Sequence, residues 1–234
     1  MSEGRKESVL DLFLKDKLIG KPEFSEPIYG AGAEGFGIYN DDKSHRYYLY
    51  IDLKNDNTKN ILTAIMLNPS EKAFDGAFDA TVTAVIEIAR KSHINKELAK
   101  FSAVEIINLF SYKEPNAKKA EEYWQNNKIN VNFIKKFLSE ENRFNNPILI
   151  AWGNKGCKVG KENFIDIITA INNYSGNLYA YYINGTKKNE LKEYRLKPIL
   201  EKQPTHPSPR NKQQLNKFFE NPELILITKE PKDT

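Results

Sequence analysis

Hydrophobic and polar positions follow two different periods along the chain, and these periods separate helices from strands. Residues 7–19 repeat apolar side chains with a helical spacing, with Leu10, Phe13 and Leu14 expected on one side. The segments GFGIYN and HRYYLYIDL, separated by DDKS, predict a β-hairpin. The N-terminal part of the chain is therefore expected to contribute one amphipathic helix and one hairpin.

After residue 60 the pattern changes to short apolar runs separated by segments of helical length. The runs predict four buried strands, namely ILTAIML (61–67), AVEIINLF (103–110), PILIAWG (147–153) and NLYAYYING (177–185). Helices are expected at TVTAVIEIARK, with Asp79 as its N-cap, and at residues 116–138, 161–172 and 213–219. Strands that alternate with helices favour parallel crossover connections with helices on both faces of the sheet.

The expected fold class is therefore α/β. We expect a three-layer α/β/α sandwich with a central, mainly parallel four-stranded sheet, to which the N-terminal helix and β-hairpin are added. In this division residues 1–58 form an extension packed on the core, and residues 59–234 form the α/β domain.

The composition is that of an ordinary globular protein, with 234 residues, 40% hydrophobic and 28% charged. One cysteine, Cys157, and three scattered histidines, His45, His93 and His206, give no zinc or iron–sulfur ligand spacing, so no metal and no cofactor are expected. The N-terminus is too charged for a secretory signal, and no apolar run reaches the ~20 residues needed to span a bilayer. We therefore expect a cytoplasmic protein that is not bound to a membrane.

Positive charge is concentrated in the C-terminal third of the chain. The net charge is +4, but residues 151–218 carry twelve Lys and Arg against five acidic residues, which leaves the remainder at −3. This imbalance favours a polyanionic partner such as nucleic acid, and a solvated lysine-rich surface is the alternative explanation.

Polar residues lie near or after the ends of all four predicted strands. They are Asn-Pro-Ser at 68–70, Asn108, Trp-Gly-Asn-Lys at 152–155, and His206 on the connection after the fourth strand. Ligands of such sheets bind beyond the carboxyl ends of the strands. Turn formation, core packing and a simple loop histidine are ordinary explanations for three of these segments, but Asn108 interrupts an apolar run. A buried amide needs partners, so Asn108 either braces a loop or binds a ligand.

Four segments in this order, MLNPS, IINLF, LIAWGNKG and THPSPRN, resemble the ordered motifs of the uracil-DNA glycosylase superfamily, over roughly residues 60–220. The chain also resembles a bacterial and phage domain family of uncharacterised function that carries MLNPS, an Asp-x-Thr sequence like residues 79–81, and NLF. The first resemblance implies a DNA glycosylase, and the second names no chemistry.

The resemblance to the glycosylases implies a role for each matching residue. Asn68 would hold the attacking water, and His206 would stabilise negative charge on the departing base. Asn108 would hydrogen-bond the base edge, and Ser70 would lie beside it. Phe78, or alternatively Phe74, would stack on the flipped base. The DNA-binding residues would be Ser208, Arg210, Asn211, Lys155 and Lys212.

Two residues depart from the pattern of the fastest uracil enzymes. Asn68 stands where those enzymes carry an aspartate, which weakens water activation. Ser70 stands where they carry a tyrosine that blocks the pyrimidine C5 position. The small serine leaves this space open, so the pocket is expected to admit a 5-substituted pyrimidine.

Three functions are compatible with the sequence. The first is a monofunctional DNA glycosylase that removes a 5-modified pyrimidine, such as a modified cytosine of phage DNA, in antiviral defence. The second is a glycosylase that removes uracil or mismatched thymine in DNA repair. The third is a non-catalytic nucleic-acid-binding protein. In each case the expected partner is DNA, either a duplex with a flipped pyrimidine or a single strand. The protein is expected to bind it as a monomer.

Overall fold

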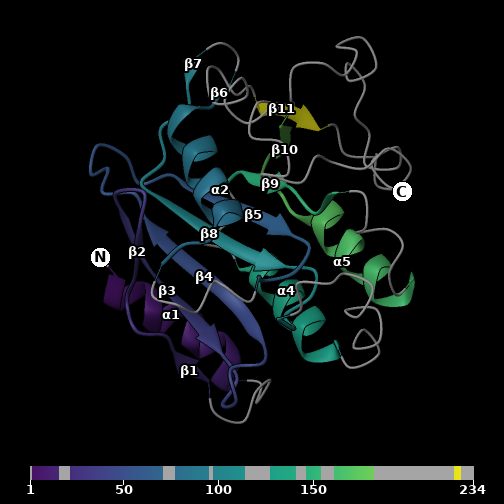
Figure 1. Ribbon diagram of the computed structural model, residues 1–234. Helices are drawn as coiled ribbons and strands as arrows, with labels where there is room; N and C mark the ends of the chain where they lie inside the picture. The colour runs from purple at the N-terminus through teal and green to yellow at the C-terminus, as the bar shows by residue number, and fades with distance from the viewer. Residues whose placement is uncertain are drawn as a thin grey trace.

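The computed structural model describes residues 2–15, 22–70, 77–94, 97–113, 127–140, 146–153, 161–181 and 224–227 (Figure 1). The helices in these ranges are α1 (Ser2–Lys15), α2 (Ala80–Lys91), α4 (Lys128–Ser139) and α5 (Lys161–Asn173). The strands are β1 (Glu23–Phe24), β2 (Ile28–Gly30), β3 (Ala33–Tyr39), β4 (Arg46–Asp52), β5 (Ile61–Met66), β6 (His93–Ile94), β7 (Glu97–Leu98), β8 (Ala103–Asn108), β9 (Ile148–Ile150), β10 (Leu178–Tyr181) and β11 (Leu224–Ile227).

The expected α/β class is confirmed, and the sheet is larger than the sequence predicts. Within the described residues the sheet has nine strands in the order β1-β3-β4-β8-β5-β9-β10-β11, with β2 paired to β3. Its middle is the expected parallel unit of four strands, in which β5 pairs with β8 and β9, and β10 pairs with β9. Antiparallel strands extend this unit on both sides, with β4 next to β8 and β11 next to β10.

The N-terminal hairpin is continuous with the parallel strands, because β4 pairs directly with β8 through Tyr48 opposite Ile107. All but the last residue of β4 are buried, so both of its faces are covered. A strand with this burial pattern belongs in the interior of a sheet. The hairpin that the sequence analysis treats as an addition is therefore part of the main sheet, because its strand β4 is hydrogen-bonded to β8.

Helices cover both faces of the sheet, as expected for a three-layer sandwich (Figure 1). One core cluster joins α1, α4 and α5 to side chains such as Tyr48, Ile65 and Ile107. A second cluster lies on the other face and joins α2 to neighbours of those side chains, such as Ala64 and Ile106. This alternation of successive residues between the two faces follows from the period of two along a strand.

The first helix begins earlier than predicted and differs in its buried side, while the predicted end at residues 16–19 lies outside the described residues. It spans Ser2–Lys15, and its buried residues are Val9, Leu12 and Phe13. The prediction that Leu14 lies on the buried side with Phe13 was wrong, because the Leu14 side chain is 51% exposed. The Phe13 ring fixes the orientation of the helix by stacking on Phe133 of α4 at a centroid distance of 4.4 Å.

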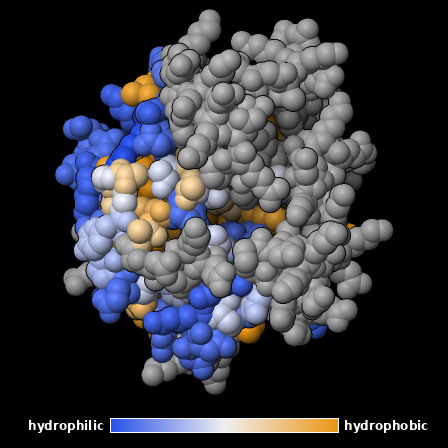
Figure 2. Space-filling view, in the orientation of Figure 1, coloured by the Kyte–Doolittle hydropathy of each residue, from blue (hydrophilic) through white to orange (hydrophobic). Residues whose placement is uncertain are grey.

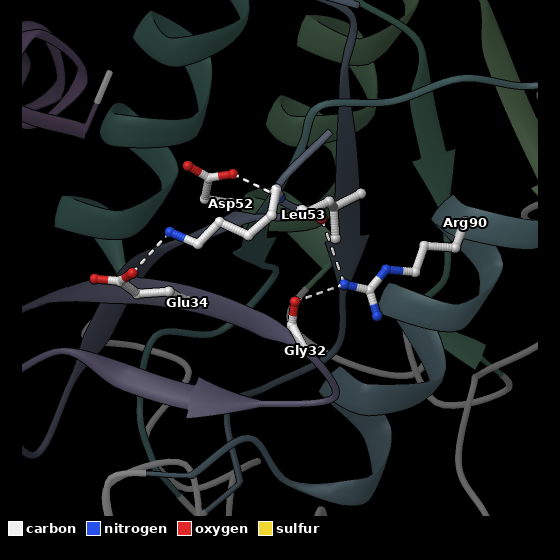
Figure 3. A network of polar contacts seen from close by, with 6 residues as sticks. Gly32, Glu34, Asp52, Leu53 and Arg90 are labelled. Carbon is white, nitrogen blue, oxygen red and sulfur yellow. Dashed lines mark hydrogen bonds and ion pairs between the residues drawn. The ribbon is translucent and has the colours of Figure 1, made fainter. Parts of the chain in front are cut away.

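The helix α2 begins and ends as its sequence predicts. Asp79 is its N-cap, and the Asp79 carboxylate accepts hydrogen bonds from the backbone amides of Thr81 and Val82. In the last turn, Arg90 donates to the carbonyl oxygens of Ala31, Gly32 and Leu53, and Figure 3 shows two of these contacts. Arg90 thus ties the C-terminal end of α2 to the β2–β3 turn and to the end of β4.

The remaining elements agree in part with the prediction. Helix α4 lies within residues 116–138 except for its last residue, while residues 114–126 and the predicted helix at 213–219 lie outside the described part of the chain. Strand β11 was not predicted. In the described ranges, none of the helices combines the length and the hydropathy needed to cross a membrane.

Candidate functional site

The carboxyl edge of the parallel strands gathers most of the described residues that the sequence singles out. Asn68 and Ser70 follow β5, Asn108 is the last residue of β8, and Trp152 follows β9. Because β4 and β3 are antiparallel to their neighbours, the start of β4 and the end of β3 lie at this same edge. The expectation that the strand ends bring these segments together is therefore met for the part of the chain that the structure describes.

The Asn108 side chain is buried and braces no described residue. Its side chain is 1% exposed, and neither its Nδ2 nor its Oδ1 atom has a hydrogen-bond partner among the described residues. Two other asparagines brace the loop instead. Asn130 Nδ2 donates to the Asn108 carbonyl oxygen at 2.9 Å, and Asn127 Nδ2 donates to the Leu109 carbonyl oxygen at 2.7 Å. Within the described part of the chain, the bracing of this loop therefore does not use the Asn108 side chain.

The segment after β5 is fastened to the start of α2. Asn68 Nδ2 donates to the Pro69 carbonyl oxygen at 3.2 Å, and Ser70 Oγ donates to Asp79 Oδ2. The other carboxylate oxygen, Asp79 Oδ1, accepts from the amides of Thr81 and Val82 at 2.8 and 2.7 Å. One carboxylate therefore caps the helix and also fixes the Ser70 hydroxyl.

Sequence reasoning missed Arg46, which a β-bulge turns toward α2. Ile38 pairs with Tyr48 and Tyr39 pairs with Arg46, so Tyr47 is an extra residue between the two pairs. Tyr47 packs with Tyr48 in the core cluster of α1 and α4. The bulge therefore places Arg46 on the opposite face, which is the face that α2 covers.

The Arg46 guanidinium is a buried cation. It is 2% exposed, and its Nε and Nη1 atoms have no hydrogen-bond partner among the described residues. Burial lowers the pKa of Arg46, while the Tyr39 hydroxyl, through its charge and a side-chain hydrogen bond, and the charge of the Asp79 carboxylate act to raise it. Burial likewise raises the pKa of Tyr39, and the positive charge of Arg46 opposes this shift. Tyr39 and Arg46 are partners in the ladder between β3 and β4, so their side chains are neighbours on the sheet, and the negative charge of Asp79 also acts on Arg46.

Phe78, the predicted stacking residue, packs on the N-terminal strands. A Cβ atom built on Gly30 would lie 3.2 Å from Phe78 Cδ2, and one built on Gly35 would lie 3.2 Å from Phe78 Cζ. The ring is half-buried against the second core cluster. Figure 2 shows an apolar area around β2 and the segment before α2, where Ala31 and Ala77 are exposed. The structure thus gives Phe78 a packing role in joining α2 to β2 and β3.

Trp152 occupies the end of β9 on the face covered by α5. It is fully buried, and its ring meets that of Phe164 edge-on at a centroid distance of 5.9 Å. Its Nε1 atom has no hydrogen-bond partner in the described ranges. Gly153 follows with a φ of 71°, a conformation that favours glycine. Trp152 is thus mainly a core residue, which agrees with the core packing that the sequence analysis gave as one explanation for this residue.

The other predicted site residues lie outside the described part of the chain. They are His206, Ser208, Arg210, Asn211, Lys155, Lys212 and the alternative stacking residue Phe74. Their predicted roles stay predictions.

The described part of the site combines hydrogen-bond donors with one positive charge, and its one carboxylate is already engaged. Asn108 offers an amide donor and acceptor, and Arg46 offers N–H donors. Among the described residues, no group of three or more His, Cys, Asp or Glu side chains is arranged to hold a metal ion. This arrangement is suited to hold a polar organic group that carries oxygen acceptors.

Comparison with known proteins gives one match. A family model described as "Protein of unknown function (DUF1643)" matches residues 46–208, which contain Arg46, Asn68, Asp79 and Asn108. No curated protein and no solved structure matches the chain.

Proposed function

The chain belongs to the DUF1643 family, and we propose that it is a monofunctional DNA glycosylase. In this proposal it hydrolyses the N-glycosidic bond of a flipped-out pyrimidine, in particular a 5-modified one, and leaves an abasic site. It acts on DNA as a monomer in the cytoplasm, without a cofactor. If the modification is one that phages carry, the enzyme serves antiviral defence.

The observation that carries this proposal is the buried Asn108 amide at the carboxyl edge of the sheet, which has no partner among the described residues. An unpaired amide in the protein interior costs free energy, and a ligand that fills its hydrogen bonds recovers that cost. The edge of a pyrimidine carries both donors and acceptors, so a planar amide matches it well. Base flipping is the step that brings such an edge into a buried site.

The other residues of the site support the same chemistry. Hydrolysis of the N-glycosidic bond needs a water near C1′ of the sugar, and in the proposal Asn68 orients it from the loop after β5. The departing base carries negative charge, which a positive or hydrogen-bonding environment stabilises. In the proposal His206 supplies this stabilisation, and Ser70 leaves space beside C5 of the base.

Excision of defined pyrimidines tests the proposal. Duplex and single-stranded oligonucleotides that differ in one base would carry cytosine, uracil, thymine or a 5-substituted cytosine. After incubation, alkali cleaves the DNA at each abasic site. We expect strand breaks at a 5-substituted pyrimidine, and Asn108→Ala should reduce the single-turnover rate by about 10- to 100-fold, the equivalent of one or two lost hydrogen bonds.

A matched control separates catalysis from folding. Asn57 is an exposed asparagine far from the carboxyl edge, and Asn57→Ala should leave the rate unchanged. Breaks at uracil alone would favour a repair enzyme. If no substrate is cleaved, although the wild type binds DNA, the proposal is wrong and the site belongs to a nucleic-acid-binding protein.

A further inference from the structure

Three polar side chains, Tyr39, Arg46 and Asn108, stand at neighbouring strand ends, and Asp79 caps α2, whose face of the sheet Arg46 shares; we call these four the Arg46 cluster. The first three come from the neighbouring strands β3, β4 and β8, and each stands at the strand end that meets the carboxyl edge. Neighbouring strands are about 4.8 Å apart, so side chains on one face of adjacent strands approach each other. The strand ends therefore bring Tyr39, Arg46 and Asn108 to neighbouring positions of the sheet.

Among the described residues, Asp79 is the carboxylate that acts on Arg46, and it is shared among several donors. Two backbone amides at the start of α2 and the Ser70 hydroxyl already donate to it. Its charge stabilises Arg46 from nearby, but the Nε and Nη1 donors of Arg46 have no acceptor among the described residues. Buried donors without acceptors are costly, so a group that supplies acceptors to these two nitrogen atoms would stabilise the folded protein.

The donors of Arg46 and Asn108 define the kind of group that would complete the cluster. Both side chains are nearly fully buried, and they come from adjacent strands. A guanidinium prefers acceptors with negative charge and forms shorter, stronger hydrogen bonds with carboxylate or phosphate oxygens. A methyl group in the same place would leave the donors unfilled.

We propose that Arg46 and Asn108 form a binding site for an oxyanion group of the ligand, such as a carboxylate. The inference rests on the proposed function where it concerns DNA, and it then assigns the substrate as a pyrimidine whose substituent carries oxygen acceptors rather than a plain methyl group. The same chemistry can come from a backbone phosphate, and the experiment distinguishes these two sources.

Binding of small probes tests the site without DNA cleavage. The melting temperature of the full-length protein would be measured with uracil, thymine, 5-carboxyuracil and inorganic phosphate, because a ligand that binds the folded state raises it. We expect 5-carboxyuracil to stabilise the wild type more than thymine does. Arg46→Met should weaken this binding by about 10- to 100-fold, as expected for lost hydrogen bonds to a charged group.

The stability of Arg46→Met and a control variant, Lys54→Met, separate loss of binding from misfolding. Arg46→Met should fold with a melting temperature equal to or above that of the free wild type, because it removes a buried cation with unfilled donors. Lys54→Met removes the same charge from an exposed residue that follows β4 at its other end, where Lys54 Nζ pairs with Glu34 at 2.8 Å. This control should bind the probes like the wild type.

Each result decides for or against the site. A strong loss of stability in Arg46→Met would show that Arg46 is structural and would overturn the inference, as would equal stabilisation by thymine and 5-carboxyuracil. Stabilisation by phosphate alone would keep the oxyanion site and assign it to the DNA backbone. If Arg46-dependent binding is found but no DNA is cleaved, the proposed function fails and the oxyanion site stands.

Discussion

Replacement of Asp79 tests the electrostatic structure of the site through protein stability. Asp79→Ala should lower the free energy of unfolding by about 3 kcal/mol, whereas Asp79→Asn should lower it by about 1 kcal/mol. The two variants differ because asparagine keeps an oxygen that caps α2 but loses the negative charge that faces Arg46. The difference between them therefore separates helix capping from charge.

The larger value is the sum of three losses. The two amides that Asp79 caps, at 2.8 and 2.7 Å, represent an N-cap whose removal costs about 1 kcal/mol. The hydrogen bond from Ser70 contributes about 1 kcal/mol. The attraction between the carboxylate and Arg46 adds about 1 kcal/mol, a modest value because Asp79 is partly exposed to solvent.

A double-mutant cycle isolates the charge effect. In an Arg46→Met background the cationic partner is gone, so Asp79→Asn should cost close to nothing, and the coupling energy should be about 1 kcal/mol. Urea denaturation monitored by tryptophan fluorescence and by circular dichroism would give the four free energies. The same cost of Asp79→Asn in both backgrounds would refute the proximity of Arg46 and Asp79 as a source of stability.

Three other substitutions probe specificity, packing and protonation. Ser70→Tyr should slow excision of a base with a large 5-substituent far more than excision of uracil, and equal slowing in single-turnover assays would contradict an open pocket. Gly35→Ala should destabilise the protein by about 1 to 3 kcal/mol, because its Cβ would collide with the Tyr50 carbonyl oxygen, whereas Gly4→Ala, with open space around it, should be neutral or stabilising in urea denaturation. Burial lowers the pKa of His45, so the unfolded chain binds its proton more readily and stability falls as the pH decreases below about 6.5. His45→Asn should therefore lose less stability than the wild type between about pH 7.5 and about pH 5, and identical pH profiles would exclude His45 as a source of the acid sensitivity.

Local signals predicted the parts of the site that depend on neighbouring residues in the chain. Asp79 was predicted as an N-cap because capping needs only the few residues that follow it, and the structure confirms this role. Asn108 was predicted because an amide inside an apolar run must find partners. The parallel strand arrangement followed from the alternation of apolar runs and helical segments, which is also a local property.

Features that depend on pairing between distant segments could not be predicted. The orientation of Arg46 follows from the bulge at Tyr47, which exists only in the register between β3 and β4. A strict alternation along HRYYLYIDL would place Arg46 on the same face as Tyr48, away from α2. The pairing of β4 with β8 was missed for a related reason, because burial on both faces gives an apolar run whose neighbour the sequence does not identify.

The contrast between the two arginines at opposite ends of α2 supports the proposal that the Arg46 cluster binds a ligand. Arg90, near the C-terminal end, joins elements together, and it does so with donors that meet the carbonyl oxygens of Ala31, Gly32 and Leu53. Arg46, near the N-terminal end, is more deeply buried, so its unfilled donors are costlier than those of a partly exposed residue would be. An arginine needed for architecture alone would be expected to have contacts like those of Arg90. Among the described residues, Arg46 and its neighbour Asn108 both lack acceptors or donors for buried side-chain atoms, and in our proposal one ligand fills both sets.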